Sequence, residues 1–284
     1  MEAVKDHRRS WENFNYVYPV ISRRSKGVSI GINLNPDKVC NFDCVYCEVD
    51  RKIPSAGKNL SLASLASELV TMLKLWQTGS LFKTEPFASV PQEWRDLKDI
   101  AFSGDGEPTT CPVFPEVVHI ASEIRSEFGC PDVKLVLITN ATCLERASVK
   151  KGIQLMQKGP YEIWAKLDAG TEKYYKQVNR SFVHFERILQ NISETAQWCP
   201  LMIQSLFFRM RGKPPPKEEI FAYCDQLRTI QKAGGKILKL HLYTIARPTT
   251  ESWATALSNE ELDRIASVIR TRVNIPQELA YAPE

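Results

Sequence analysis

Three cysteines stand close together near the start of the chain, where Cys40, Cys44 and Cys47 follow the spacing C-x3-C-x2-C. Thiolates are soft ligands that suit iron–sulfur clusters or zinc. A [4Fe–4S] cluster is held by cysteine thiolates, so three protein ligands would leave one iron open to bind a further molecule. The alternatives are a zinc site completed by a distant residue and three unrelated core cysteines. Because the chain has no second C-x2-C pair, the spacing favours the cluster.

Two later segments carry groups that could bind a small molecule. In "AFSGDGEPT", Gly104 and Gly106 would let the backbone approach a ligand closely, and Glu107 could bind an ammonium group, although an ordinary glycine-rich turn is the alternative. In "EIWAKLDAG", Lys166 and Asp168 share one face of a strand, since alternate residues point the same way. Two charges on a buried strand are costly unless they are paired or functional, so we expect an ion pair or a binding site there.

Three further polar residues are candidates for the same site. Asn140 ends the segment "LVLITN", where it is either a ligand or a turn residue. Gln204 stands in the middle of "LMIQSLFF", where a buried amide must find partners, and we expect contact with a cofactor or substrate. Arg247 follows "ILKLHLYTIA", and its guanidinium could bind a substrate carboxylate or phosphate or form a surface salt bridge.

These residues must be positioned by strands and helices that alternate along the chain. Strands are predicted at 27–35, 99–104, 133–140, 161–170, 201–208 and 237–246, and helices at 61–77, 113–128, 147–158, 181–198, 216–232 and from Ser258, where Glu261 would complete a capping box.

Six such β/α units predict a parallel sheet with helices outside it. Six is fewer than the eight units of a closed barrel. The prediction is therefore an α/β fold, a partial, open (β/α)6 TIM-like barrel, with a flat doubly wound sheet as the alternative. In either fold, the functional groups gather at the carboxyl ends of the strands.

Length and composition are those of an ordinary globular protein. The 284 residues are 43% hydrophobic and 25% charged, and we expect a single domain over 1–284, with a core at about 17–275 and an insertion loop at about 77–98. A net charge of +4 is too small to indicate nucleic-acid binding by itself. The charged N-terminus does not resemble a signal peptide, and no run of 18 apolar residues predicts a membrane span, so we expect a cytoplasmic protein with no membrane partner.

The cysteine motif, placed after the first strand and with Tyr46 before its last cysteine, resembles the radical S-adenosylmethionine (radical SAM) superfamily. The resemblance implies two cofactors, a [4Fe–4S] cluster and S-adenosylmethionine (SAM). The open iron would bind SAM, and one electron would cleave the sulfonium to a 5′-deoxyadenosyl radical that abstracts hydrogen from a substrate. Tyr46 would lie along the adenine.

The resemblance also assigns roles to the later segments. Residues 104–108 are similar to the family's Gly-Gly-Glu-Pro segment, which contacts the methionyl amino group, but Asp105 interrupts the glycine pair here. Similarity to the glycyl-radical-activating branch would put Lys166 on the methionyl carboxylate and Asp168 on a ribose hydroxyl. Asn140 is a further SAM contact in many members of the family.

Three more segments, "LDAGTEKYYKQVNR", "IQSLFF" and "YTIARPTTESWATALSNEELDRIA", are similar to small stand-alone Fe–S oxidoreductases loosely related to the wyosine-forming tRNA enzymes. No cysteine precedes Cys40, which departs from the wyosine pattern. The resulting hypothesis is a radical SAM enzyme that acts on a small molecule, peptide or RNA and takes electrons from a reductant such as flavodoxin or ferredoxin. An activating enzyme that installs a radical on a partner protein and a non-enzymatic metal-binding module are the alternatives.

Overall fold

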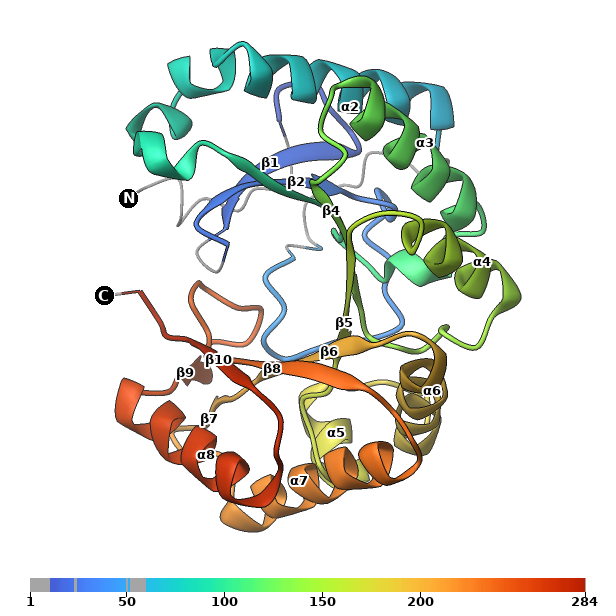
Figure 1. The fold of residues 1–284 in the computed structure, drawn as a ribbon. Coiled ribbons are helices and arrows are strands. Elements are labelled where there is room, and N and C mark those ends of the chain that lie inside the picture. The colour runs from blue at the N-terminus through green and yellow to red at the C-terminus, as the bar shows by residue number, and fades with distance from the viewer. Residues whose placement is uncertain (1–10, 23–24, 50, 52–59, 284) are drawn as a thin grey trace. The chain divides into compact units, whose positions relative to one another are not determined.

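A computed structural model of the chain describes residues 11–22, 25–49, 51 and 60–283. The chain divides into two compact units (Figure 1). The first consists of Met1–Cys40, Ile53–Ile138 and Arg146–Glu162, and the second of Asn41–Lys52, Thr139–Glu145 and Ile163–Glu284. The organisation of the chain as a single domain stays a prediction.

The first unit is built on four neighbouring strands: β1 (Val17–Ser22), β2 (Gly27–Ile32), β3 (Leu97–Phe102) and β4 (Lys134–Thr139). β1 runs antiparallel to β2, whereas β2, β3 and β4 are parallel to one another. Every residue of β2 is buried, as expected for a strand covered on both faces. The sequence predicted β2, β3 and β4 and missed β1, in which Pro19 is compatible with the edge of a sheet but not with a central strand.

Three helices lie along the strands of this unit (Figure 1): α2 (Leu62–Gln77), α3 (Phe114–Glu127) and α4 (Ala147–Met156). Ser61 caps α2, because its Oγ accepts a hydrogen bond from the Ser64 N–H at 3.2 Å. The predicted insertion loop contains three short 3-10 helices: η1 (Ser80–Lys83), η2 (Phe87–Ser89) and η3 (Gln92–Trp94). Leu81, Phe82 and Phe87 are buried, so apolar side chains anchor this segment.

The second unit contains four parallel strands: β5 (Tyr161–Lys166, which begins at the end of the first unit), β6 (Leu201–Leu206), β8 (Ile237–Tyr243) and β10 (Gln277–Ala280). They pair in the order β5-β6-β8-β10. The sequence predicted β5, β6 and β8 but missed β10. A separate antiparallel ribbon joins β7 (Phe208–Met210) to β9 (Ala254–Ala256).

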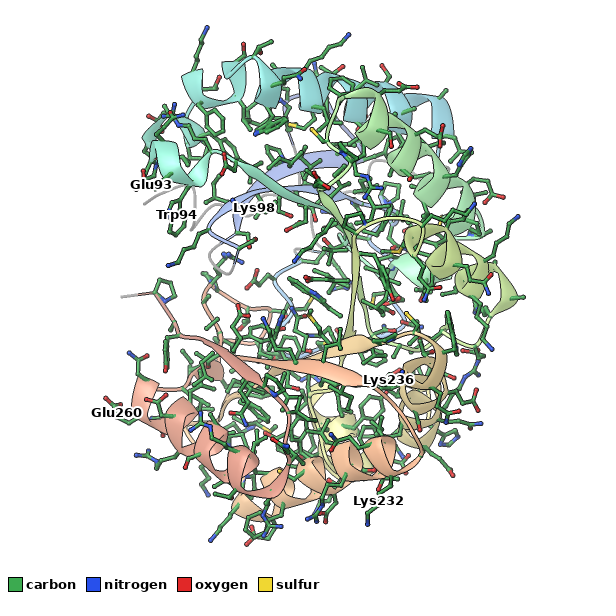
Figure 2. The ribbon with its side chains drawn as sticks, in the orientation of Figure 1. Glu93, Trp94, Lys98, Lys232, Lys236 and Glu260 are labelled. Carbon is green, nitrogen blue, oxygen red and sulfur yellow. The ribbon has the colours of Figure 1, made fainter. Side chains whose placement is uncertain are left out.

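Four helices lie on one side of these strands (Figure 1): α5 (Glu172–Val178), α6 (Phe185–Trp198), α7 (Lys217–Lys232) and α8 (Asn259–Arg272). The predicted capping box of Ser258 and Glu261 is present at the start of α8. Charged side chains such as Lys232 and Glu260 project from the helices away from the strands (Figure 2). No helix among the described residues is long and apolar enough to cross a membrane.

Candidate cluster and cofactor site

Two of the three motif cysteines lie in one turn of the second unit. The Cys47 N–H donates to the Cys44 carbonyl oxygen at 2.9 Å, which closes the turn. Each sulfur also accepts a hydrogen bond, from Asn179 Nδ2 to Cys44 Sγ at 3.3 Å and from Arg51 Nη1 to Cys47 Sγ at 3.3 Å. Burial outweighs the hydrogen bond from Asn179, which lowers the pKa of Cys44 because an N–H donor stabilises the charged form of its acceptor.

Cys40 belongs to the first unit, whereas Cys44 and Cys47 belong to the second. Within the described ranges, no group of three or more His, Cys, Asp or Glu side chains is arranged to hold a metal ion. The donor chemistry still fits an iron–sulfur cluster. Burial, with a second contribution from Asp168, raises the pKa of Cys44 to about 12, so a buried thiolate here requires a cationic partner such as iron.

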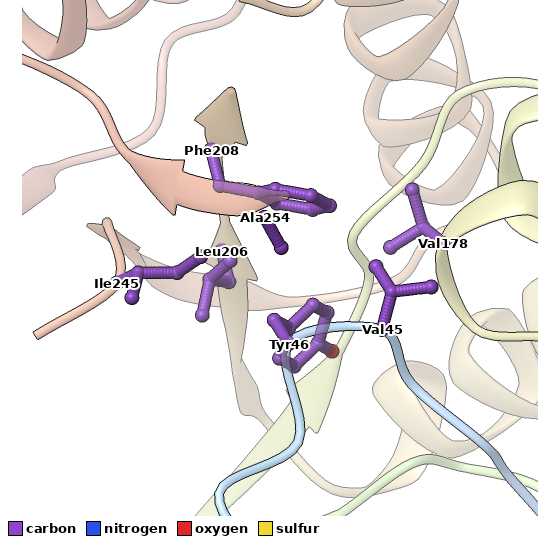
Figure 3. Close-up of a cluster of buried hydrophobic side chains, with 7 residues drawn as sticks. All are labelled: Val45, Tyr46, Val178, Leu206, Phe208, Ile245 and Ala254. Atoms are coloured by element: carbon purple, nitrogen blue, oxygen red, sulfur yellow. The ribbon is translucent and has the colours of Figure 1, made fainter. Parts of the chain in front are cut away.

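Tyr46 lies between the two cysteines in the sequence, and its side chain belongs to a cluster of buried hydrophobic side chains (Figure 3). Its ring packs in a cluster of buried side chains, and it meets the Phe208 ring edge-on at a centroid distance of 5.8 Å. The cluster consists of Val45, Tyr46, Val178, Leu206, Phe208, Ile245 and Ala254. At the other end of the side chain, the Tyr46 hydroxyl group donates a hydrogen bond to Asp168 Oδ2. Tyr46 is thereby fixed at both ends of its side chain.

Asp168 is the centre of a buried hydrogen-bond network. Its Oδ1 accepts from the Leu206 N–H at 2.9 Å, and its Oδ2 accepts from Tyr46 and from Asn179 Nδ2, the latter at 3.3 Å. Lys166 Nζ lies 3.7 Å from Oδ1, so the predicted pair of charges is present, although β5 ends at Lys166 and Asp168 lies two residues beyond it. Asp168 is 4% exposed, and these four partners stabilise its negative charge in the interior.

Lys166 joins this network to β8, which is separated from β5 by β6. Its Nζ donates to the Tyr243 hydroxyl at 2.8 Å and lies 5.0 Å from the centre of the Tyr46 ring. Burial alone would lower the pKa of Lys166, but Asp168 and then Tyr243 outweigh it, so the pKa is raised above its usual value. Lys166 is therefore a persistent cation beside the cysteine turn.

A polar row crosses the second unit at one level of the sheet. The register places Lys166 beside Gln204, Gln204 beside His241, and His241 beside Glu278. Glu278 Oε2 accepts from Lys239 Nζ at 2.8 Å. Since paired residues of parallel strands share a face, Gln204 and Lys166 are on the same face, as the predicted site requires.

Arg247 lies in an ion pair with the segment that follows the cysteine turn. Its Nη1 donates to Glu48 Oε2 at 2.9 Å, and the Arg247 side chain is 17% exposed. The salt bridge that the sequence left open is thus present. The role of Arg247 as a substrate contact stays a prediction.

The glycine-rich segment follows β3 in the first unit. A Cβ atom added to Gly104 would overlap Asn33, and one added to Gly106 would overlap the Val39 carbonyl oxygen, so both positions need glycine for close backbone packing. Glu107 is 2% exposed, and its Oε1 accepts from the Thr109 N–H at 3.1 Å, which caps the 3-10 helix η4 (Pro108–Thr110). Contact of these residues with SAM stays a prediction.

Asn140 connects the loop after β4 with the residue next to Cys40. Its Nδ2 donates to Asn41 Oδ1 at 2.7 Å, and its Oδ1 accepts from the Thr142 N–H at 3.1 Å. Asn41 Nδ2 in turn donates to Thr142 Oγ1 at 2.6 Å. Asn140 therefore has the turn role that the sequence left open, and its contact with SAM stays a prediction.

Sequence reasoning missed Asn179, which contacts both Cys44 and Asp168. Asn179 follows α5, and an Asn at the end of a helix is usually a cap without further function. Its partner Cys44 is 135 residues away in the chain. No local pattern in the sequence could have indicated this contact.

Comparison with known proteins gives distant relatives. No family model matches the chain. A protein named GTPase Obg of Brachyspira hyodysenteriae is 23% identical over 261 residues, which cover 90% of this chain and 34% of that protein. A UPF0026 protein of Methanocaldococcus jannaschii is 28% identical over 180 residues, covering 62% of this chain and 46% of that protein. The matched residues thus span less than half the length of these two curated relatives.

Comparison with solved structures shows the fold. A radical SAM methyltransferase from Sphaerobacter thermophilus matches with a TM-score of 0.64 at 12% identity, over 94% of this chain and 70% of that protein. Streptococcus suis SuiB bound to S-adenosylmethionine matches with a TM-score of 0.57 at 12% identity, over 88% of this chain and 50% of that protein. A structure of TYW1 with a lysine-pyruvate adduct matches with a TM-score of 0.54 at 14% identity, over 87% of this chain and 74% of that protein.

The chain therefore has the fold of the radical SAM enzymes. This confirms the resemblance given by the cysteine motif and the predicted α/β fold class, a partial TIM-like barrel. The match to the Brachyspira relative covers 34% of that protein, and this sequence contains no G-x4-G-K-[S/T] phosphate-binding motif.

Proposed function

We propose that this chain is a radical SAM enzyme that uses a [4Fe–4S] cluster and SAM to abstract hydrogen from a substrate. The observation that carries the proposal is the network at Cys44. Asn179 links the sulfur of this motif cysteine to the buried Asp168, and the cation Lys166 lies 3.7 Å from Asp168. A cysteine sulfur, a cation and a network of buried polar groups beside one another form the kind of site that holds charged cofactors.

The residues divide into two groups by their chemistry. Cys40, Cys44 and Cys47 would hold the cluster. When bound, the cluster and SAM together supply a 5′-deoxyadenosyl radical, which requires one electron from a reductant such as flavodoxin or ferredoxin.

The second group would bind and orient SAM. Lys166 would bind the carboxylate of SAM. The ammonium group of Lys166 is a cation, and charge-assisted hydrogen bonds to a carboxylate are strong. Tyr46 has a fixed ring that the adenine would contact. Glu107 and Asn140 would complete the site. Asp168 would act mainly through Lys166 and Tyr46, because its oxygens already accept from several donors.

The test is anaerobic reconstitution with iron and sulfide, followed by reduction with dithionite in the presence of SAM. The expected result is release of 5′-deoxyadenosine, with none from a Cys44→Ala variant. Cys224→Ala is the matched control, because Cys224 is fully buried in α7 and the motif does not include it. A fully loaded protein that releases no 5′-deoxyadenosine would contradict the proposal. Comparing metabolites and RNA from cells with and without the protein would then identify the substrate class.

A further inference from the structure

Asn179 is a buried amide that faces a motif cysteine. It is the C-cap of α5 and is 1% exposed. Its Nδ2 lies 3.3 Å from Cys44 Sγ, 3.3 Å from Asp168 Oδ2 and 3.4 Å from the Tyr46 hydroxyl. A side-chain amide has two N–H donors, and the Tyr46 hydroxyl already donates to Asp168. The two amide protons are shared among the sulfur, the carboxylate and the Tyr46 hydroxyl, whose oxygen accepts while its own O–H donates.

The backbone around Asn179 gives this amide little freedom. The Asn179 N–H donates to the Tyr175 carbonyl at 2.7 Å, and its own carbonyl accepts from the Asp43 N–H at 2.9 Å. The Val178 carbonyl accepts from the Val45 N–H at 2.9 Å. The residues on both sides of Cys44 are thus bonded to the end of α5. Since the segment is held by its backbone, the Asn179 side chain is preorganised toward the sulfur.

We propose that Asn179 is a positioning residue that holds the Cys44 sulfur and raises the reduction potential of the cluster bound there. The inference rests on the proposed function, because it requires a cluster on Cys44. Reduction adds negative charge to a cluster, and hydrogen bonds to its sulfurs stabilise that charge. The contact from Asn179 Nδ2 to Asp168 compensates part of the carboxylate charge, which would otherwise repel the incoming electron. Both contacts act in the same direction.

The test compares the reduction potentials of reconstituted proteins by EPR-monitored titration without SAM. Asn179→Leu removes both N–H donors at similar volume, and Asn179→Ala does so with less steric demand. Asn191→Ala is the control, because Asn191 is a buried amide of α6 that donates to Ala141 and Glu145 at 2.8 Å each, with no sulfur as partner.

Both Asn179 variants should be harder to reduce than the wild type by at least about tenfold in the one-electron equilibrium, which is about 59 mV. The control should keep the wild-type potential. Folded Asn179 variants that lose iron while Asn191→Ala retains it would also support the positioning role. Equal potentials in all four proteins, or equal iron loss in the Asn179 and Asn191 variants, would overturn the inference. A wild-type protein that binds no cluster is a separate outcome, which contradicts the proposed function itself.

Discussion

Replacement of Lys166 by Met tests how the proposed site binds SAM. The change removes the ammonium group and keeps the length of the aliphatic chain. Asp168 keeps three hydrogen-bond donors, from Tyr46, Asn179 and Leu206, so its charge remains partly compensated. The Cys44 sulfur keeps its contact with Asn179. The cysteine turn should therefore survive the substitution, and iron content should not change.

The expected loss follows from the contact that Lys166 would make. A hydrogen bond to a charged group contributes about 1.5–3 kcal/mol, which corresponds to roughly 10- to 150-fold in affinity. Lys166→Met should weaken SAM binding by this factor, as measured by calorimetry on anaerobically reconstituted protein. Lys239→Met is the control, because Lys239 pairs with Glu278 on the same face of the sheet and should leave SAM affinity unchanged.

A second variant separates the charge of Lys166 from its position. Tyr243→Phe removes the hydroxyl that Lys166 contacts at 2.8 Å and keeps the cation beside Asp168. Its effect on SAM affinity should be much smaller than that of Lys166→Met. Unchanged SAM affinity in Lys166→Met, at full iron loading, would refute the assignment of the carboxylate to Lys166.

Three more predictions follow from the same contacts. Cys44→Ala should abolish iron binding, whereas Cys224→Ala should retain it; equal iron loss in both would show that the ligands are misplaced. Asp168→Ala leaves several buried donors without their acceptor and should lower the free energy of unfolding by about 3–5 kcal/mol, measured by urea denaturation; a loss below about 1 kcal/mol would contradict the network. The hydrogen bonds from Arg209 lower the pKa of Glu261 below its ordinary value of 4.5, so this carboxylate stabilises the fold above that value and the stabilisation is lost as the pH falls through the lowered pKa. The stability difference between wild type and Glu261→Gln should therefore be constant near neutral pH and shrink in acid, and a difference independent of pH would contradict the pairing.

Most of the fold could be predicted because its signals are local. Apolar runs gave six strands, and helical periodicity with capping residues gave the helices between them. Four strands of the described residues were missed: β1, β10 and the two short strands of the ribbon, β7 and β9. β1 contains Pro19, which breaks the expected run, and β10 is a short segment, "QELA", with two polar residues. α5 was missed because its seven residues are too few to show helical periodicity.

The candidate site was predictable only where one segment holds the whole signal. Alternation along the segment 161–170 predicted that Lys166 and Asp168 share a face, and the two charges are 3.7 Å apart, although the strand itself ends at Lys166. The spacing of the cysteines likewise lies within one loop. The contacts of Asn179 and Glu278 could not be predicted, because they depend on how distant segments pair. For the same reason, the sequence could not show that Arg247 reaches Glu48, 199 residues away.

The central claim is that three cysteines hold a cluster whose open iron binds SAM. The most direct measurement is the EPR spectrum of the anaerobically reconstituted and reduced protein, recorded with and without SAM beside iron and sulfide analysis. The account predicts about four irons and four sulfides per chain and a cluster signal that changes when SAM is added. A protein that holds one zinc and no sulfide, or a cluster signal that SAM leaves unchanged, would contradict it.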